Sequence, residues 1–249
     1  MKRAAILCLL LTPFFLPSSF AQFNTGSNSS EAAALFQAAQ KEQNPKLIKA
    51  LCLKALTIDS IFIDARNYLA ETYWNLNLTD SALSMYQSSL EKYPRGIRAH
   101  EGLARLYQKK GEHQTAILQY QELLQHYPGY PPALYGMAMV YFTQNQFPES
   151  IEYSEQAMRL YLAANRPEHA ADARMLAGQA YLKHGNANRA IKYFKASKKR
   201  FGDKPYFYYH LGECYLMLGK TEKAEELFAQ AQSRGYQIPM HLRKKQGSK

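Results

Sequence analysis

Apolar and small residues recur along this chain in five segments that share one pattern. One copy, from Gly102 to Pro128, reads GLARLYQKKGEHQTAILQYQELLQHYP. In each copy, two amphipathic stretches flank a Gly or Asn, and the apolar residues in both stretches repeat at helical spacing. Gly and Asn tolerate the left-handed conformation that ends a helix. The pattern therefore predicts a helix–turn–helix hairpin in every copy.

Equivalent positions carry the same residue types at a fixed step. The first helix carries a small residue, which is Ala70, Ala104, Ala138, Gly178 or Gly212. A large residue in the second helix is Tyr86, Tyr120, Phe194 or Phe228, with Ser154 as the one departure. The step is 34 residues, except for 40 residues between Ala138 and Gly178. We expect the extra residues to lengthen a helix that begins near Pro167, because proline fits the first turn of a helix.

This pattern resembles the tetratricopeptide-repeat (TPR) family, whose repeat is about 34 residues long. The resemblance implies an all-α fold: a right-handed α-solenoid of stacked helix-turn-helix repeats. Stacking is required because one hairpin cannot bury its apolar face alone. The resemblance places the solenoid at residues 31–238. About six repeats are expected, the first of them degenerate, near 29–62, 63–96, 97–130, 131–164, 171–204 and 205–238.

The resemblance also implies a concave groove, lined by the first helices, that usually receives a peptide or a helix. The expected contact residues are Trp74, Arg105, Lys109, Tyr135, Met139, Phe142 and Tyr209. Met175 and Leu182 are expected to face the same groove. Exposed aromatic and Met side chains mark partner binding. Two interpretations remain open: a protein or peptide partner, or coverage of the groove by the tail or by a second copy of the chain.

One TPR subgroup clamps acidic peptide termini with Lys and Asn at groove positions. Here Asn67 and Glu71 stand in one repeat, and Glu101 and Arg105 stand in the next. Because this set departs from the clamp, the resemblance does not carry that particular partner over.

The two ends of the chain do not follow the repeat pattern. Lys2 and Arg3 precede an apolar run that ends at Leu16, which is typical of a secretory signal peptide over residues 1–21, cleaved near Ala21. A polar linker at 22–30 and a basic C-terminal tail at 239–249 are expected on either side of the repeats. Ile238, Met240 and Leu242 could form a short cap. A periplasmic or secreted location follows from the signal peptide.

The formal net charge of +11 favours acidic partners without selecting one. Lys192, Lys195 and Lys199 recur at helical spacing and predict a basic face. This face suggests an alternative function, in which an envelope assembly component docks to an anionic surface or glycan. Nucleic acid is not an expected partner, because no nucleic-acid-binding pattern accompanies the export signal.

The sequence offers little chemistry. It contains none of the common catalytic or phosphate-binding motifs, so we expect no enzyme activity, no cofactor and no metal site. Cleavage near Ala21 would leave Cys52 and Cys214, which lie four repeats apart, too far for a disulfide. Both are predicted to be buried, reduced thiols. The main hypothesis is thus an exported TPR adaptor for a protein or peptide.

Overall fold

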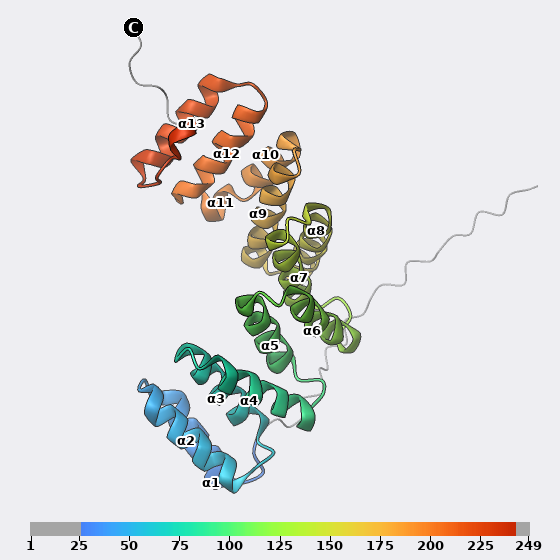
Figure 1. Cartoon of the computed structure of the whole chain (residues 1–249), viewed down its shortest axis with the longest axis vertical. Coiled ribbons are helices and arrows are strands. Elements are labelled where there is room, and N and C mark those ends of the chain that lie inside the picture. Colours follow the sequence, from blue (N-terminus) through green and yellow to red (C-terminus); the bar gives the residue numbers. More distant parts are fainter. Residues whose placement is uncertain (1–25, 243–249) are drawn as a thin grey trace, which may run out of the picture. The chain divides into compact units, whose positions relative to one another are not determined.

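The computed structural model describes residues 26–242, and every regular element within this range is a helix (Figure 1). The helices are α1 (Ser30–Lys41), α2 (Pro45–Ile58), α3 (Ile63–Asn75), α4 (Thr79–Lys92), α5 (Ile97–Lys110), α6 (His113–His126), α7 (Pro131–Thr143), α8 (Phe147–Ala163), α9 (Pro167–Lys183), α10 (Ala187–Ala196), α11 (Lys198–Phe201), α12 (Pro205–Met217), α13 (Thr221–Ser233) and the 3₁₀ helix η1 (Met240–Leu242). The expected signal peptide and most of the expected basic tail lie outside the described residues. None of the described helices is both long and apolar enough to cross a membrane.

The chain divides between Ala65 and Arg66 into two compact units. Unit 1 contains the α1–α2 hairpin, whose helices pack against each other. Ser29 starts α1 by accepting a hydrogen bond from the Ala32 N–H, and Pro45 occupies the first turn of α2. The rings of Phe36 and Phe62 meet edge to face, with their centroids 5.0 Å apart.

Unit 2 contains the later hairpins, which pack in chain order. The partners within hairpins are α5 with α6, α7 with α8, α9 with α10, and α12 with α13. The partners between successive hairpins are α4 with α5, α6 with α7, α8 with α9, and α10 with α12. This confirms the predicted fold class: an all-α solenoid of stacked helix-turn-helix repeats. The turns follow the predicted chemistry, because Gly111 has φ 79° and Asn145 has φ 58°.

Large rings of the second helices pack against glycines of the first helices. A Cβ added at Gly102 would overlap the ring of Tyr86, which comes from the preceding hairpin. Gly136 receives Tyr120 of the preceding hairpin in the same way. Glycine is therefore required at both places for the helices to approach this closely.

The last two hairpins pack their rings differently. A Cβ added at Gly178 would lie 2.8 Å from Cε1 of Phe194, and Gly212 meets Phe228 in the same manner. In both cases the ring and the glycine belong to the same hairpin, not to successive ones. The glycine position also shifts, because Gly178 and Gly212 align with Ala104 and not with Gly102.

The departure at Ser154 coincides with the irregular step in the repeat. Ser154 is fully buried and donates its hydroxyl to the Ser150 carbonyl oxygen at 2.6 Å. The first helix of the next hairpin carries Leu176, which is 7% exposed, at the place that Gly102 and Gly136 hold earlier. α8 and α9 are 17 residues each, and α9 begins at Pro167. The extra residues thus lengthen both helices, whereas the sequence pattern assigned them to one.

The C-terminal segment packs back onto α13. Ile238 is 3% exposed and packs with Phe228 and Ala231, and Leu242 lies against the same cluster. Met240 is 84% exposed, so the expectation that it joins this cap is wrong. It lies in the short η1 helix, where consecutive residues cannot all face α13.

Candidate partner-binding pocket

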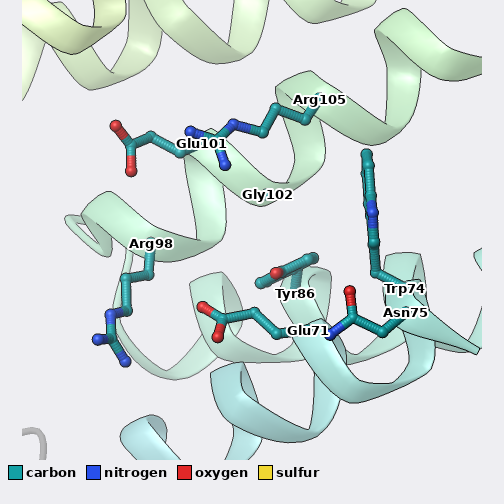
Figure 2. A pocket seen from close by; sticks show the side chains of 8 residues that line it. All are labelled: Glu71, Trp74, Asn75, Tyr86, Arg98, Glu101, Gly102 and Arg105. Atoms are coloured by element: carbon teal, nitrogen blue, oxygen red, sulfur yellow. The ribbon is translucent and has the colours of Figure 1, made fainter.

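A pocket of about 280 Å³ lies in unit 2, where the first helices of two successive hairpins meet (Figure 2). It is lined by Glu71, Trp74 and Asn75 from α3, Tyr86 from α4, and Arg98, Glu101, Gly102 and Arg105 from α5. Two predicted groove residues, Trp74 and Arg105, therefore meet in one pocket. Its volume is at the small end for ligand sites and suits one long side chain.

Tyr86 forms the floor of the pocket. Its ring is 4% exposed because Gly102 lets it lie directly against α5. Burial raises the pKa of Tyr86 well above its usual range, and the nearby Glu71 charge adds to this effect. The hydroxyl therefore stays protonated and can both donate and accept a hydrogen bond.

Trp74 forms a wall of the pocket and stands upright beside it in Figure 2. The Lys109 ammonium lies 5.5 Å from the centroid of the Trp74 ring and donates a hydrogen bond to Asn77 Oδ1 at 3.0 Å. The cation–π contact and the hydrogen bond together hold both side chains in place. Lys109 thus helps to position Trp74 and is less available to a partner than the sequence suggested.

Four charged side chains surround the floor. Glu101 accepts a hydrogen bond from the Tyr130 hydroxyl at 3.2 Å, and burial raises its pKa above the ordinary value. The other three, Glu71, Arg98 and Arg105, take part in none of the ion pairs formed within residues 26–242. In Figure 2, the Glu71 carboxylate extends toward the side where Arg98 lies, and Arg105 reaches along α5 toward Glu101.

The predicted residues of α7 lie outside this pocket. Tyr135 packs against the buried cluster around Leu134 and Tyr161, and burial raises its pKa. Met139 is 42% exposed, and the ring of Phe142 lies 5.8 Å from that of Phe147. Met139 therefore presents apolar surface on α7, whereas Tyr135 is engaged in packing.

The predicted residues nearer the C-terminus are partly or wholly covered. Tyr209 stacks on Tyr236, with ring centroids 4.6 Å apart. Met175 and Leu182 are 6% and 3% exposed and belong to the core cluster that contains Phe194. The expectation that they face a groove is wrong, because α9 contacts α7, α8, α10 and α12 and has little open surface there.

Arg98, Tyr86 and Gly102 were missed as pocket residues by the sequence reasoning. Arg98 lies one helical turn before Glu101, so extending the predicted α5 face by one turn would have found it. Tyr86 was recognised only as a packing position. Its role as the floor depends on the neighbouring glycine, and the repeat pattern alone does not reveal that pairing.

The predicted basic face is narrower than its sequence suggests. Lys192 and Lys195 lie exposed on α10, and Lys199 lies exposed on the short α11, which follows a break at Ser197. The neighbouring Arg200 is paired: its Nε donates to Asp172 Oδ1 at 2.7 Å, and it also contacts Glu168. The three predicted lysines are therefore divided between two helices, and the exposed Lys198 lies beside Lys199 on α11.

The two cysteines within the described part of the chain are buried and free, as predicted. Burial raises the pKa of Cys52 to about 11 and that of Cys214 to about 12, so both thiols are protonated at neutral pH. Among residues 26–242, no three His, Cys, Asp or Glu side chains are arranged to hold a metal ion.

Comparisons with known proteins identify the repeat. Two family models described as tetratricopeptide repeat match residues 131–201 and residues 69–131 and 175–237. No curated protein matches significantly. Solved structures share the fold. YrrB, described as a TPR protein with an unusual peptide-binding site, is 20% identical with a TM-score of 0.61, over 74% of this chain and 92% of that one.

Two further structures give the same result. MamA is 18% identical with a TM-score of 0.60, over 69% of this chain and 91% of that one. PilF of Pseudomonas aeruginosa is 19% identical with a TM-score of 0.62, over 71% of this chain and 78% of that one. At such identities the likeness concerns the fold alone.

Proposed function

Because the chain belongs to the tetratricopeptide-repeat family, we propose that it is a non-enzymatic adaptor that binds a peptide or protein segment on the first helices of its repeats. The peptide-binding site in the description of YrrB supports this class of function. Repeat solenoids offer extended surfaces for such binding, because each hairpin adds one more first helix.

The pocket between α3 and α5 is the observation that carries the proposal. It combines an aromatic wall, a tyrosine floor and side chains of both charges, all supplied by first helices or the helix beneath them. Trp, Tyr and Arg are the residues most enriched among the energetically important contacts of protein interfaces. We infer that Trp74 and Arg105 are the central contacts, and that the exposed Met139 extends the contact area.

A direct test compares the full-length chain with its Trp74→Ala variant. Each is immobilised and exposed to an envelope extract of the source organism, and the captured proteins are identified by mass spectrometry. We expect at least one protein to be retained by the wild type and lost by the variant. Leu118→Ala, a substitution of an exposed apolar residue on α6, is the matched control and should retain it. Equal capture by all three proteins would count against the pocket.

We also propose that the adaptor works outside the cytoplasm, in the periplasm or as a secreted protein. The basic start and apolar run of residues 1–21 support this location. Cell fractionation followed by N-terminal sequencing tests it. A mature chain that begins at Gln22 in the extracytoplasmic fraction is expected, whereas a full-length chain in the cytoplasm would contradict export.

A second candidate function rests on the exposed Lys192, Lys195 and Lys199. These side chains could dock the protein to an anionic lipid or glycan surface. Vesicles containing phosphatidylglycerol provide the probe. Binding through the lysines should fall steeply as salt increases and should be lost in a triple Lys→Gln variant. Peptide binding in the α3–α5 pocket should not change in that variant.

A further inference from the structure

The charges around the α3–α5 pocket have an arrangement that restricts what can enter it. Glu71 stands on α3, whereas Arg98, Arg105 and the partly buried Glu101 stand on α5, so the α3 side is negative and the α5 side keeps a positive excess. Glu71, Arg98 and Arg105 form no ion pair with another described residue. A charge that is desolvated without a partner is costly, so an occupant must supply complementary groups.

The α3 side of the pocket is suited to a cation. The Glu71 carboxylate and the Trp74 ring belong to this side, and Tyr86 forms the floor between it and α5. A carboxylate pairs with an ammonium or guanidinium group, and an indole ring attracts the same groups through its electron-rich face. The contact between Lys109 and Trp74 shows that this ring already takes part in such an interaction.

The α5 side of the pocket is suited to a carboxylate. Arg98 and Arg105 are separated by two helical turns and so share one face of α5. Both side chains are exposed. Glu101 lies between them, and the charges of Arg105 and Arg98 partly offset the effect of burial on its pKa. Glu101 accepts a hydrogen bond from Tyr130 and forms no ion pair with either arginine, so both guanidinium groups keep donors free. Each guanidinium can therefore donate a charge-assisted hydrogen bond to an incoming carboxylate.

We propose that the pocket recognises a partner segment in which a Lys or Arg side chain lies beside an Asp or Glu side chain. The basic side chain enters between Glu71 and Trp74 and reaches the Tyr86 hydroxyl, while the acidic side chain contacts Arg98 and Arg105. This inference rests on the proposed adaptor function and specifies the chemistry of its partner.

Segments with only one kind of charge fit less well. A purely acidic segment would meet repulsion from Glu71, and a purely basic one would meet repulsion from Arg98 and Arg105. An apolar segment would cover three charges without compensating any of them. The pocket therefore discriminates by repulsion as well as by attraction, which is the usual basis of specificity.

The test begins with a display library of random linear heptapeptides, panned on the immobilised full-length chain with Trp74→Ala protein as the counter-selection. We expect the enriched peptides to carry a basic residue within two positions of an acidic one. A synthetic peptide with the enriched sequence is then titrated against Glu71→Gln and Arg98→Gln/Arg105→Gln proteins. Each variant should weaken binding roughly tenfold, as expected for loss of a charge-assisted hydrogen bond.

Coupling between protein and peptide assigns the two halves of the site. The Glu71→Gln effect should disappear when the basic residue of the peptide is replaced by Gln, but it should persist when the acidic residue is replaced. The arginine variant should show the opposite dependence. Lys223→Gln, which removes a charge from α13, is the matched control and should bind as the wild type does. Circular dichroism melting of each variant shows that folding is intact.

The outcomes separate the two proposals. Enriched peptides that require Trp74 but lack paired charges would overturn the recognition chemistry and leave the adaptor function standing. The same conclusion would follow if both charge variants reduced the affinity for the peptide by less than about twofold. A library that yields no peptide above the Trp74→Ala background would overturn both.

Discussion

The hairpins of unit 2 use one aromatic position in two ways. In the N-terminal part, Tyr86 packs against Gly102 of the following hairpin, and Tyr120 does the same at Gly136. In the C-terminal part, Phe194 packs against Gly178 of its own hairpin. The difference lies in where the glycine stands on the first helix, since Tyr86, Tyr120, Phe194 and Phe228 occupy equivalent positions in their copies.

This difference determines where a pocket can form. Where the ring crosses to the next hairpin, it brings a hydroxyl to the first helices: Tyr86 lines the pocket, and the Tyr120 hydroxyl donates to Gln108 Oε1 at 3.4 Å. Where the ring stays in its own hairpin, it is a buried Phe without a polar end. The following hairpin then presents His210, whose ring stacks on Phe194 at 5.7 Å and occupies that space.

The largest expected effect comes from removing the ring that stays in its own hairpin. Phe194 is 0% exposed, so Phe194→Ala would leave a cavity against Gly178. We expect a loss of about 3–5 kcal/mol in the free energy of unfolding, measured by urea denaturation. Phe147→Ala, at a half-buried position, should cost clearly less. Equal losses for the two variants would show that the α9–α10 hairpin does not depend on this ring.

A smaller change in stability is expected when the contact between Tyr120 and Gly136 is altered, and the departure at Ser154 suggests how to alter it. Ser154 and Leu176 hold the places that Tyr120 and Gly136 hold one hairpin earlier, with the large and small residues exchanged. Gly136→Leu alone should destabilise by about 1–3 kcal/mol, because the added side chain meets Tyr120. Combined with Tyr120→Ser, it should cost less than the sum of the two single changes.

The control for this cycle uses a distant glycine. Gly212 contacts Phe228 and has no contact with Tyr120, so Tyr120→Ser and Gly212→Leu should be additive within about 0.5 kcal/mol. Additivity in the Tyr120–Gly136 pair as well would contradict a direct ring-on-glycine contact. Urea denaturation monitored by circular dichroism measures all five variants.

At the hairpin junction without a crossing ring, polar contacts connect the helices instead. Glu155 of α8 accepts hydrogen bonds from the hydroxyls of Tyr181 at 2.7 Å and Tyr193 at 2.5 Å. Tyr193→Phe should destabilise by about 1 kcal/mol, the usual net value of one such bond. Tyr153→Phe, which keeps the ring that stacks on Tyr141, serves as the comparison and should change stability little. If Tyr193→Phe left the stability unchanged, the hydrogen bond from Tyr193 to Glu155 would not contribute to this junction.

The fold could be predicted from sequence because five copies repeat the same small and aromatic positions. Their spacing specifies hairpins, and the hairpins must stack to bury their apolar faces. The turns at Gly111 and Asn145 were also predictable, since few residue types tolerate positive φ. These features depend on neighbours within one or two repeats, which a periodic pattern records.

The pocket could be predicted only in part. Trp74 and Arg105 were found because they occupy first-helix positions that face outward in the repeat. Leu182 aligns with Trp74, and Met175 aligns with the pocket residue Glu101, but both are buried, because α9 packs against α7, α8, α10 and α12. Periodicity assigns a residue to a face of its helix, whereas the covering of that face depends on helix length and on irregular steps between repeats.

The two parts of unit 2 also differ in how they hold a carboxylate at the surface of their first helices. In α12, burial alone would raise the pKa of Glu213, but the hydrogen bond with His210 Nδ1 at 2.9 Å and the nearby Lys183 lower it below 4.5 overall. In α5, burial dominates and raises the pKa of Glu101 above 4.5, despite its hydrogen bond from Tyr130.

These opposite shifts predict opposite pH dependences, which are the smallest effects expected. The folded state holds the Glu213 proton less tightly than the unfolded state, so its stabilisation is present above pH 4.5 and is lost as pH falls through the lowered pKa. The folded state holds the Glu101 proton more tightly, so stability is lost as pH rises from 4.5 through the raised pKa. The measurement is the urea midpoint of unfolding as a function of pH. Glu213→Gln should reduce the loss of stability at acid pH, whereas Glu101→Gln should remove the loss of stability at higher pH. If both variants changed the same side of the profile, the two glutamates would not have opposite pKa shifts. Because Glu101 lines the pocket, the pH dependence of peptide binding would then show in which direction its pKa is shifted.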